Sequence, residues 1–301
     1  MPLAHQQGAP PNGKTRARFA HYSQTRPPAA TTRRPQVLSR RYTIASRGVP
    51  TETHLPLPHH VHEAYESYGQ IGRGPLLLTC EHASRRVPAP LRSSAADRAA
   101  LATHWGYDIG ARTVTRALAR STCSAAFFTR YSRLVCDANR APEADHYART
   151  HVEGHAMSFN QRLTAAELQR RTDRYHQPYH QAISDALAAT PGATVLSVHS
   201  FTPVWDGVPR RLDAGVLFDA HDETAIKLAE ALRAAGLRTE LNEPYSGKQG
   251  LMYSPHRHGA AHQRLYLELE LNQALISDSA AARRVAKVVA TALAQVLSFP
   301  L

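Results

Sequence analysis

Residues 194–199 read TVLSVH, a short apolar run that ends at a histidine. A helical pattern over residues 159–189 precedes this run, and Gly192 marks the end of that helix. The pattern downstream repeats the alternation, with an apolar run at 215–218, a helix over 221–236, the strictly alternating LYLELEL at 265–271 and a last helix capped by Ser277 and Asp278. Strands interleaved with helices predict an α/β fold, a doubly wound, mostly parallel mixed sheet with helices on both faces.

The pattern upstream of residue 194 supports the same fold. An apolar run at 75–79 leads into Glu81 and His82, a helical pattern covers residues 97–120, and a strand pattern at 125–136 leads into Asp137. Polar residues thus follow three strands, those that end near His82, Asp137 and His199. Because ligands of open α/β sheets gather beyond the carboxyl ends of the strands, these residues form the first candidate site.

The charge of the chain is concentrated at its N-terminus. The net charge is +12, but residues 1–51 contain nine Lys or Arg and no acidic residue, which leaves 27 basic and 24 acidic residues in the rest. We therefore expect a disordered basic arm over residues 1–58 and a single α/β domain over 59–301. Since the basic pI belongs largely to the arm, it does not imply that the domain binds nucleic acid.

The cysteines and the hydropathy pattern indicate the setting in which the protein works. Three cysteines with no Cys-x-x-Cys spacing argue against a disulfide framework and for a reducing compartment. No apolar run approaches the roughly 20 residues that a membrane helix needs. We expect a soluble, cytoplasmic protein without a membrane partner.

Two histidines and one carboxylate are the ligands of an open, catalytic zinc site, which keeps a position for water or substrate. His82 and His199 are the two strand-end histidines available for such a site. Close-spaced zinc motifs such as His-Glu-x-x-His are absent, so distant segments would have to assemble it. His176 and His180 have the i, i+4 spacing that can bind zinc, but we expect a helix face there rather than metal ligands.

Seven short motifs occur between about residue 72 and residue 276: CEHAS at 80–84, HWGYDIG at 104–110, YSRLVCDANR at 131–140, YHQPYH at 175–180, HSFTP at 199–203, GKQG at 247–250 and ELELN at 268–272. In their residues and in their order, these motifs resemble those of the N-formylglutamate amidohydrolase family. The resemblance implies a fold like that of zinc carboxypeptidases and aspartoacylase. It also implies hydrolysis of the amide bond in N-acylated acidic amino acids.

The resemblance assigns metal and catalytic roles. His82 and His199 match the zinc histidines, and Asp108 is the third ligand that we expect, with Glu81 as the alternative. Successive strand residues point to opposite faces, so Glu81 and His82 would not readily bind one ion together. Glu270 matches the general base that takes a proton from zinc-activated water and returns it to the leaving amine, and Glu268 lies on the same strand face.

The substrate-binding residues are expected at the end of the strand over 125–136. Arg133 and Arg140 can pair with carboxylates through their planar guanidinium groups, and Asn139 can donate beside them. Asp137 would orient one of these arginines. Where many relatives have Arg after the catalytic glutamate, this chain has Asn272.

The sequence therefore predicts a zinc-dependent amidohydrolase that acts on an N-formyl acidic amino acid such as N-formylglutamate, with a small molecule as its partner. Two alternatives stay open. The acyl group could be succinyl or acetyl, or the chain could be a non-catalytic binding module that uses its basic arm. Deletion of the arm would abolish binding by such a module and would leave hydrolysis intact.

Overall fold

A computed structural model of the protein describes residues 58–301, and their centre is one eight-stranded mixed sheet. The expected basic arm, residues 1–58, lies outside the described residues except for residue 58. In spatial order the strands are β1 (His59–Val61), β2 (Tyr65–Tyr68), β4 (Ala125–Thr129), β3 (Leu76–Cys80), β7 (Thr194–Phe201), β12 (Tyr266–Asn272), β10 (Ala214–Leu217) and β11 (Thr239–Leu241). Neighbours from β4 to β12 run parallel, as do β10 and β11, whereas the pairs β1–β2, β2–β4 and β10–β12 are antiparallel.

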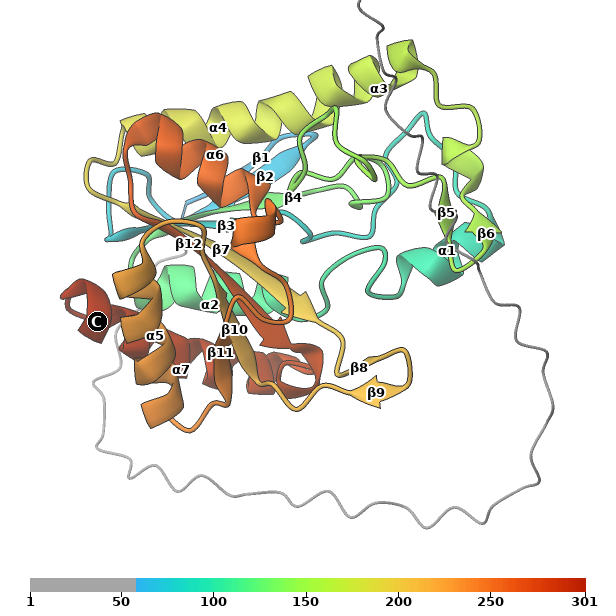
Figure 1. Ribbon diagram of the computed structural model, residues 1–301. Helices are drawn as coiled ribbons and strands as arrows, with labels where there is room; N and C mark the ends of the chain where they lie inside the picture. The colour runs from blue at the N-terminus through green and yellow to red at the C-terminus, as the bar shows by residue number, and fades with distance from the viewer. Residues whose placement is uncertain (1–57) are drawn as a thin grey trace, which may run out of the picture. The chain divides into compact units, whose positions relative to one another are not determined.

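Helices cover both faces of this sheet, which confirms the predicted fold class (Figure 1). One face carries α3 (Ala165–Arg171), α4 (Gln177–Ala188) and α6 (Tyr253–His262), and the other carries α2 (Ala111–Ser121), α5 (Asp222–Ala234) and α7 (Ser279–Leu297). The strand period of two divides the core accordingly: Leu76 and Leu78 pack with the α2, α5 and α7 side, and Leu77 packs with the α4 side. None of the described helices is both long and apolar enough to cross a membrane.

The remaining elements are short. Two hairpins, β5–β6 (His151–Val152 and His155–Ala156) and β8–β9 (Val204–Trp205 and Val208–Pro209), project from the domain, together with the helix α1 (Ala95–Leu101). Single-turn helices occur at η1 (Ser158–Asn160), η3 (Gly247–Gln249) and η4 (Gln273–Leu275). The segment η2 (Thr172–His176) is a π-helical turn between α3 and α4.

The prediction of one helix over residues 97–120 is wrong, and the difference matters for the site. Helix α1 ends at Leu101 and α2 begins only at Ala111, after Gly110 with φ +85°. That left-handed conformation interrupts a helix and suits glycine, since a Cβ on Gly110 would also lie 2.4 Å from the Ile276 carbonyl oxygen. The loop between the helices carries Asp108, whose backbone N–H donates to the carbonyl of His82 (2.9 Å).

Two strand boundaries also differ from the predicted ones. Strand β4 ends at Thr129, so the predicted strand residues 130–136 belong to a loop. Strand β7 continues to Phe201, so His199 lies within the strand and pairs with Glu270 of β12. The loop that begins at residue 130 therefore supplies pocket residues beside side chains that are held on the central strands.

Candidate active site

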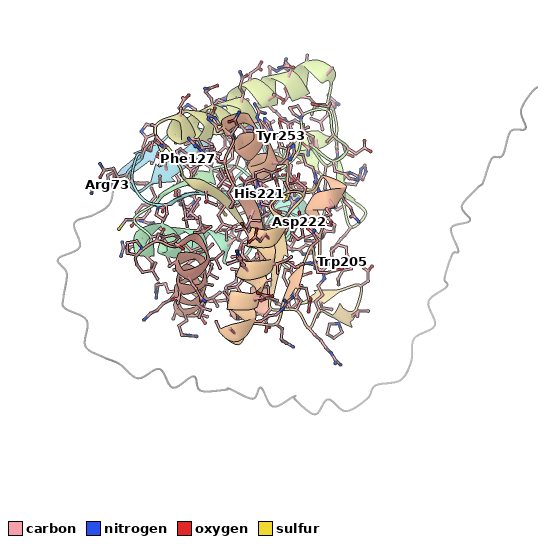
Figure 2. The ribbon with its side chains drawn as sticks, turned by 60° about the vertical axis from the view of Figure 1, so that its left-hand side comes forward. Arg73, Phe127, Trp205, His221, Asp222 and Tyr253 are labelled. Carbon is pink, nitrogen blue, oxygen red and sulfur yellow. The ribbon has the colours of Figure 1, made fainter. Side chains whose placement is uncertain are left out.

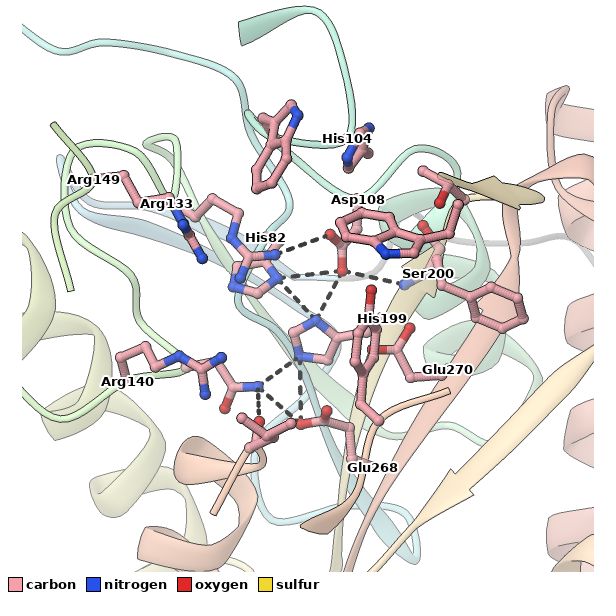
Figure 3. Close-up of a pocket in the computed structure, with 17 residues that line it drawn as sticks. His82, His104, Asp108, Arg133, Arg140, Arg149, His199, Ser200, Glu268 and Glu270 are labelled. Carbon is pink, nitrogen blue, oxygen red and sulfur yellow. Dashed lines mark hydrogen bonds and ion pairs between the residues drawn. The ribbon is translucent and has the colours of Figure 1, made fainter. Parts of the chain in front are cut away.

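The three predicted metal ligands come together at the carboxyl edge of β3 and β7. His82 follows β3, Asp108 lies in the loop before α2, and His199 lies on β7. The Nδ1 atoms of the two histidines are 3.0 Å apart, and the Asp108 Oδ2 atom lies 2.8 Å from His199 Nδ1 and 3.3 Å from His82 Nδ1 (Figure 3). All three side chains are buried, and their ligand atoms lie within 4.8 Å of one another.

The far side of each imidazole ring is held by a second carboxylate. His82 Nε2 donates to Asp137 Oδ1 (2.7 Å), and His199 Nε2 donates to Glu81 Oε2 (3.1 Å). This arrangement places the hydrogen on Nε2 and leaves the Nδ1 lone pair of each ring directed at the cluster. Carboxylate–histidine pairs of this kind orient metal-binding imidazoles.

Of the two alternatives for the third ligand, the structure brings Asp108 to the cluster and places Glu81 behind it. The Glu81 carboxylate accepts hydrogen bonds from Ser197 Oγ (2.6 Å) and from the Tyr179 hydroxyl (3.2 Å) as well as from His199. Glu81 and His82 both lie in the turn that follows β3.

The electrostatics of the cluster suit a cation. Burial alone would lower the pKa of His199, but Glu268, Asp108 and Glu81 around it raise that pKa well above its usual value. Burial alone would raise the pKa of Asp108, but the neighbouring His82 and His199 hold it far below its usual value. A buried pair of imidazoles surrounded by carboxylates has more negative than positive charge, and two nitrogen donors with one oxygen donor match the ligand set of a catalytic zinc site.

Glu268 and Glu270 both line the pocket beside this cluster, but they have different surroundings. Glu268 Oε2 accepts a hydrogen bond from Asn139 Nδ2 (3.0 Å) and lies 3.6 Å from His199 Nε2. Glu270 Oε2 has no hydrogen-bond partner among residues 58–301. Burial, with Asp108 and Glu268 nearby, raises the pKa of Glu270 well above its usual value. A carboxylate with a free oxygen and a raised pKa is suited to proton transfer.

The three predicted substrate-binding residues all line the pocket, but two of them are already engaged. Arg133 Nη2 donates to Asp137 Oδ2 (2.8 Å), and its Nη1 lies 3.7 Å from Asp108 Oδ1. Asn139 donates through Nδ2 to Glu268 and to the Leu251 carbonyl (3.3 Å), and its Oδ1 accepts from the Ser254 N–H (2.9 Å). The guanidinium group of Arg140 has no protein partner among the hydrogen bonds of the described residues.

Aromatic residues also line the pocket, and no sequence pattern indicated their arrangement. The rings of Trp105 and Trp205 are 6.2 Å apart, and His104 lies 4.8 Å from the Trp105 ring. Trp205 stands at the edge of the domain on the β8–β9 hairpin (Figure 2). Phe201 and Tyr245 also line the cavity, whose volume of about 270 Å³ suits a small molecule.

The histidines of the YHQPYH motif lie behind the pocket wall. His176 Nε2 donates to the Arg140 carbonyl (3.0 Å), and His180 Nε2 donates to the Ala138 carbonyl (3.0 Å). His180 Nδ1 in turn lies 2.8 Å from His258 Nε2. All three rings are buried. They hold the loop that carries Asn139 and Arg140, and the metal-ligand group found among the described residues does not include them.

The fold and this cluster define an α/β protein with a candidate metal centre at the carboxyl edge of its sheet. The chain belongs to the N-formylglutamate amidohydrolase family, whose model matches residues 74–277. The family resemblance expected from the motifs is thus confirmed, and with it an amidohydrolase that takes a small-molecule substrate.

Solved structures show the same fold. A gene product of Agrobacterium tumefaciens is 28% identical, with a TM-score of 0.73 over 79% of this chain and 96% of that one. An N-formylglutamate amidohydrolase from Ralstonia eutropha JMP134 is 18% identical, with a TM-score of 0.62 over 79% of this chain and 98% of that one. No curated protein sequence matches significantly.

Proposed function

We propose that the protein is a zinc-dependent amidohydrolase that cleaves the linear amide of an N-formyl acidic amino acid such as N-formylglutamate. The observation that carries this proposal is the convergence of His82 Nδ1, His199 Nδ1 and Asp108 Oδ2 beside the unpartnered carboxylate of Glu270. These three residues would hold the metal ion. When bound there, zinc supplies Lewis-acid chemistry, which lowers the pKa of water and polarises the acyl carbonyl.

The residues of the chain account for the remaining steps. Glu270 takes the proton of the attacking water on its free oxygen and returns it to the amide nitrogen as the amino acid leaves. Asp137 and Glu81 hold the two imidazoles in the tautomer that binds metal through Nδ1. Arg140, which lines the pocket, binds a carboxylate group of the substrate.

Asn272, which stands where many relatives have Arg, does not contribute to the pocket lining. Its Nδ2 donates to the Leu212 carbonyl (2.8 Å), and its Oδ1 accepts from the Ala274 N–H (3.0 Å) at the start of η4. The role of this residue is local, so its identity leaves the proposal of an acidic substrate unchanged.

Cytoplasmic location is part of the proposal. Cys80 and Cys136 are buried thiols, Cys123 is exposed, and none of the three forms a disulfide. Unpaired cysteines are typical of a reducing compartment.

The experiment is a substrate panel with metal analysis on the same full-length preparation. We expect the protein to contain near-stoichiometric zinc and to hydrolyse N-formylglutamate faster than N-acetylglutamate or N-succinylglutamate. A chelator should abolish this activity, and added zinc should restore it. Full activity in protein shown to be metal-free would overturn zinc dependence. A zinc-loaded enzyme that cleaves only the acetyl or succinyl compound would overturn the assignment of the acyl group.

A further inference from the structure

Among the three arginines that line the pocket, Arg133 is neutralised by the protein itself. Asp137 and Asp108 are its partners, at 2.8 and 3.7 Å. Burial would lower its pKa, but the two carboxylates raise it above the usual value. These two carboxylates therefore balance the positive charge of Arg133, which contributes little to the binding of an anionic ligand. Recognition of an anion by this pocket falls to the other two arginines, Arg140 and Arg149.

Arg149 lies in the loop before β5, and no sequence motif singled it out. Its guanidinium carbon lies 5.4 Å from the centre of the Trp105 ring. The Trp105 indole is fixed in turn, because its Nε1 donates to Glu153 (3.0 Å). Stacking on an aromatic face leaves the N–H edge of a guanidinium group open. No hydrogen bond or ion pair of the Arg149 side chain occurs within residues 58–301.

A buried hydrogen-bond network holds the backbone of Arg149, which fixes the point from which its side chain extends. Asn160 Nδ2 donates to the Arg149 carbonyl (2.6 Å) and to the Leu134 carbonyl (2.7 Å). Arg171, which is 2% exposed, donates to Asn160 Oδ1 (2.6 Å). This network ties the segment around Arg149 to the segment around Arg133.

The charges around Arg149 leave a place for an anion. Burial lowers the pKa of Arg149, and the positive charges of Arg133 and Arg140 lower it further, whereas Asp137 opposes them. Figure 3 shows Arg133, Arg140 and Arg149 on one side of the pocket and Glu270 on the other, with His199 between them. A substrate whose amide lies near Glu270 would place its charged groups among the arginines.

From this geometry we infer that Arg149 binds the second carboxylate of the substrate and so makes the pocket selective for amino acids with an acidic side chain. Arg140 and Arg149 are two guanidinium groups without a protein carboxylate, and they match the two carboxylates of one substrate molecule. The inference rests on the proposed function, because that function supplies the amide at the Glu270 end.

Binding of L-glutamate and L-glutamine to the zinc-supplemented protein tests this inference without any need for hydrolysis. The two ligands share the α-carboxylate and differ only in the side-chain carboxylate. Trp105 and Trp205 are the two tryptophans of the chain, and both line the pocket, so intrinsic fluorescence reports binding there. Calorimetry provides a second measurement of the same affinities.

Arg149→Met keeps an apolar chain against Trp105 and removes the charge. We expect the affinity for glutamate to fall about 10- to 100-fold, as for loss of a charge-assisted hydrogen bond, with affinity for glutamine unchanged. Arg149→Lys, which keeps the charge but not the fork, should lie between. The matched control is Arg116→Met, since Arg116 stacks on Tyr68 (4.6 Å) outside the pocket and should affect neither ligand.

Equal losses for both ligands in Arg149→Met would overturn the inference, because they would indicate contact with the shared α-carboxylate or a structural role. Unchanged discrimination in both Arg149 variants, or a wild-type protein that prefers glutamine, would also overturn it. The proposed function fails separately: selective glutamate binding that depends on Arg149, in an enzyme that hydrolyses no N-acyl amino acid, would refute the function and leave the anion site in place.

Discussion

The Asp137 carboxylate lies 2.7 Å from Nε2 of His82, on the side of the imidazole ring that faces away from His199 and Asp108. This contact fixes both the tautomer and the orientation of the ring before any ion binds. Asp137 also contacts Arg133, because its other oxygen, Oδ2, accepts a hydrogen bond from that arginine. One buried carboxylate thus links the candidate metal site to the arginine side of the pocket.

The first prediction follows from this contact. Asp137→Asn should lower zinc affinity about 10- to 100-fold, because such outer carboxylates raise the basicity of the imidazole and hold its orientation. Competition with a chromophoric chelator measures the affinity. The control is Asp213→Asn, which removes an aspartate paired with Arg238 (2.6 Å) away from the cluster and should leave zinc binding intact. Equal affinity in wild type and Asp137→Asn would exclude this role for Asp137.

The second prediction separates the two glutamates of β12. Glu270→Gln keeps the shape of the side chain but removes the proton acceptor, so kcat should fall roughly 100- to 10,000-fold with zinc content unchanged. Glu268→Gln should be much milder, because Glu268 is already bound to Asn139. His199→Ala should instead abolish zinc binding. If Glu268→Gln were inactive and Glu270→Gln active, the general base would be Glu268, two residues earlier on the same strand face.

The third prediction concerns the stability of metal-free protein. Burial raises the pKa of Glu270 well above the ordinary value of 4.5. A carboxyl group with a raised folded-state pKa favours the folded state while it is protonated, below pH 4.5, and loses that contribution as the pH rises through the folded-state pKa. In chelator-treated protein at pH 8, Glu270→Gln should therefore have a higher Tm than wild type, and the difference should shrink toward pH 4.5.

Thermal scans across this pH range measure the effect. Glu230→Gln is the control, because Glu230 is exposed on α5 and its substitution should change Tm little at any pH. A Tm of Glu270→Gln at or below that of wild type at pH 8 would mean that the buried carboxylate carries no penalty.

The sequence was sufficient for the fold because its strands are apolar runs bounded by polar residues or turns. Strands β3, β7 and β12 lie close to the runs at 75–79, 194–198 and 265–271. The prediction failed over residues 97–120, where helical periodicity continued through a loop. The break extends from the end of α1 at Leu101 to Gly110, whose φ of +85° does not fit a helix, and periodicity within the segment contains no trace of it.

The site could be predicted in part for a similar reason. His82 and His199 follow or lie in strands of the sheet, so the topology brings them to one edge. Arg149 could not be found in this way, because it belongs to a loop whose course is set by the Asn160 and Arg171 network. Its partner Trp105 lies 44 residues earlier in the chain, and only the folded structure shows that they stack.

The histidines behind the pocket wall form a chain with a defined hydrogen order. Burial lowers the pKa of His176 to about 4 and that of His258 to about 3, and burial with the neighbouring histidines holds the pKa of His180 well below its usual value. All three rings are thus neutral at pH 7. His180 donates through Nε2 to the Ala138 carbonyl, so its Nδ1 must accept the hydrogen of His258 Nε2.

The last prediction tests whether this chain positions the substrate loop. His180→Phe leaves the Ala138 carbonyl and His258 without a partner, which should cost about 1–3 kcal/mol of folding stability and raise KM for N-formylglutamate with zinc content unchanged. His180→Gln keeps a hydrogen-bond donor, so its KM should lie closer to the wild-type value than the KM of His180→Phe. His262→Ala is the matched control, since His262 joins the same helices α4 and α6 through Ser184 (2.8 Å) without touching the loop. A purely structural role would lower the stability of both His180→Phe and His262→Ala and leave KM unchanged. A KM of His180→Phe at the wild-type value would therefore refute the positioning role. A rise in KM confined to His180→Phe would support it.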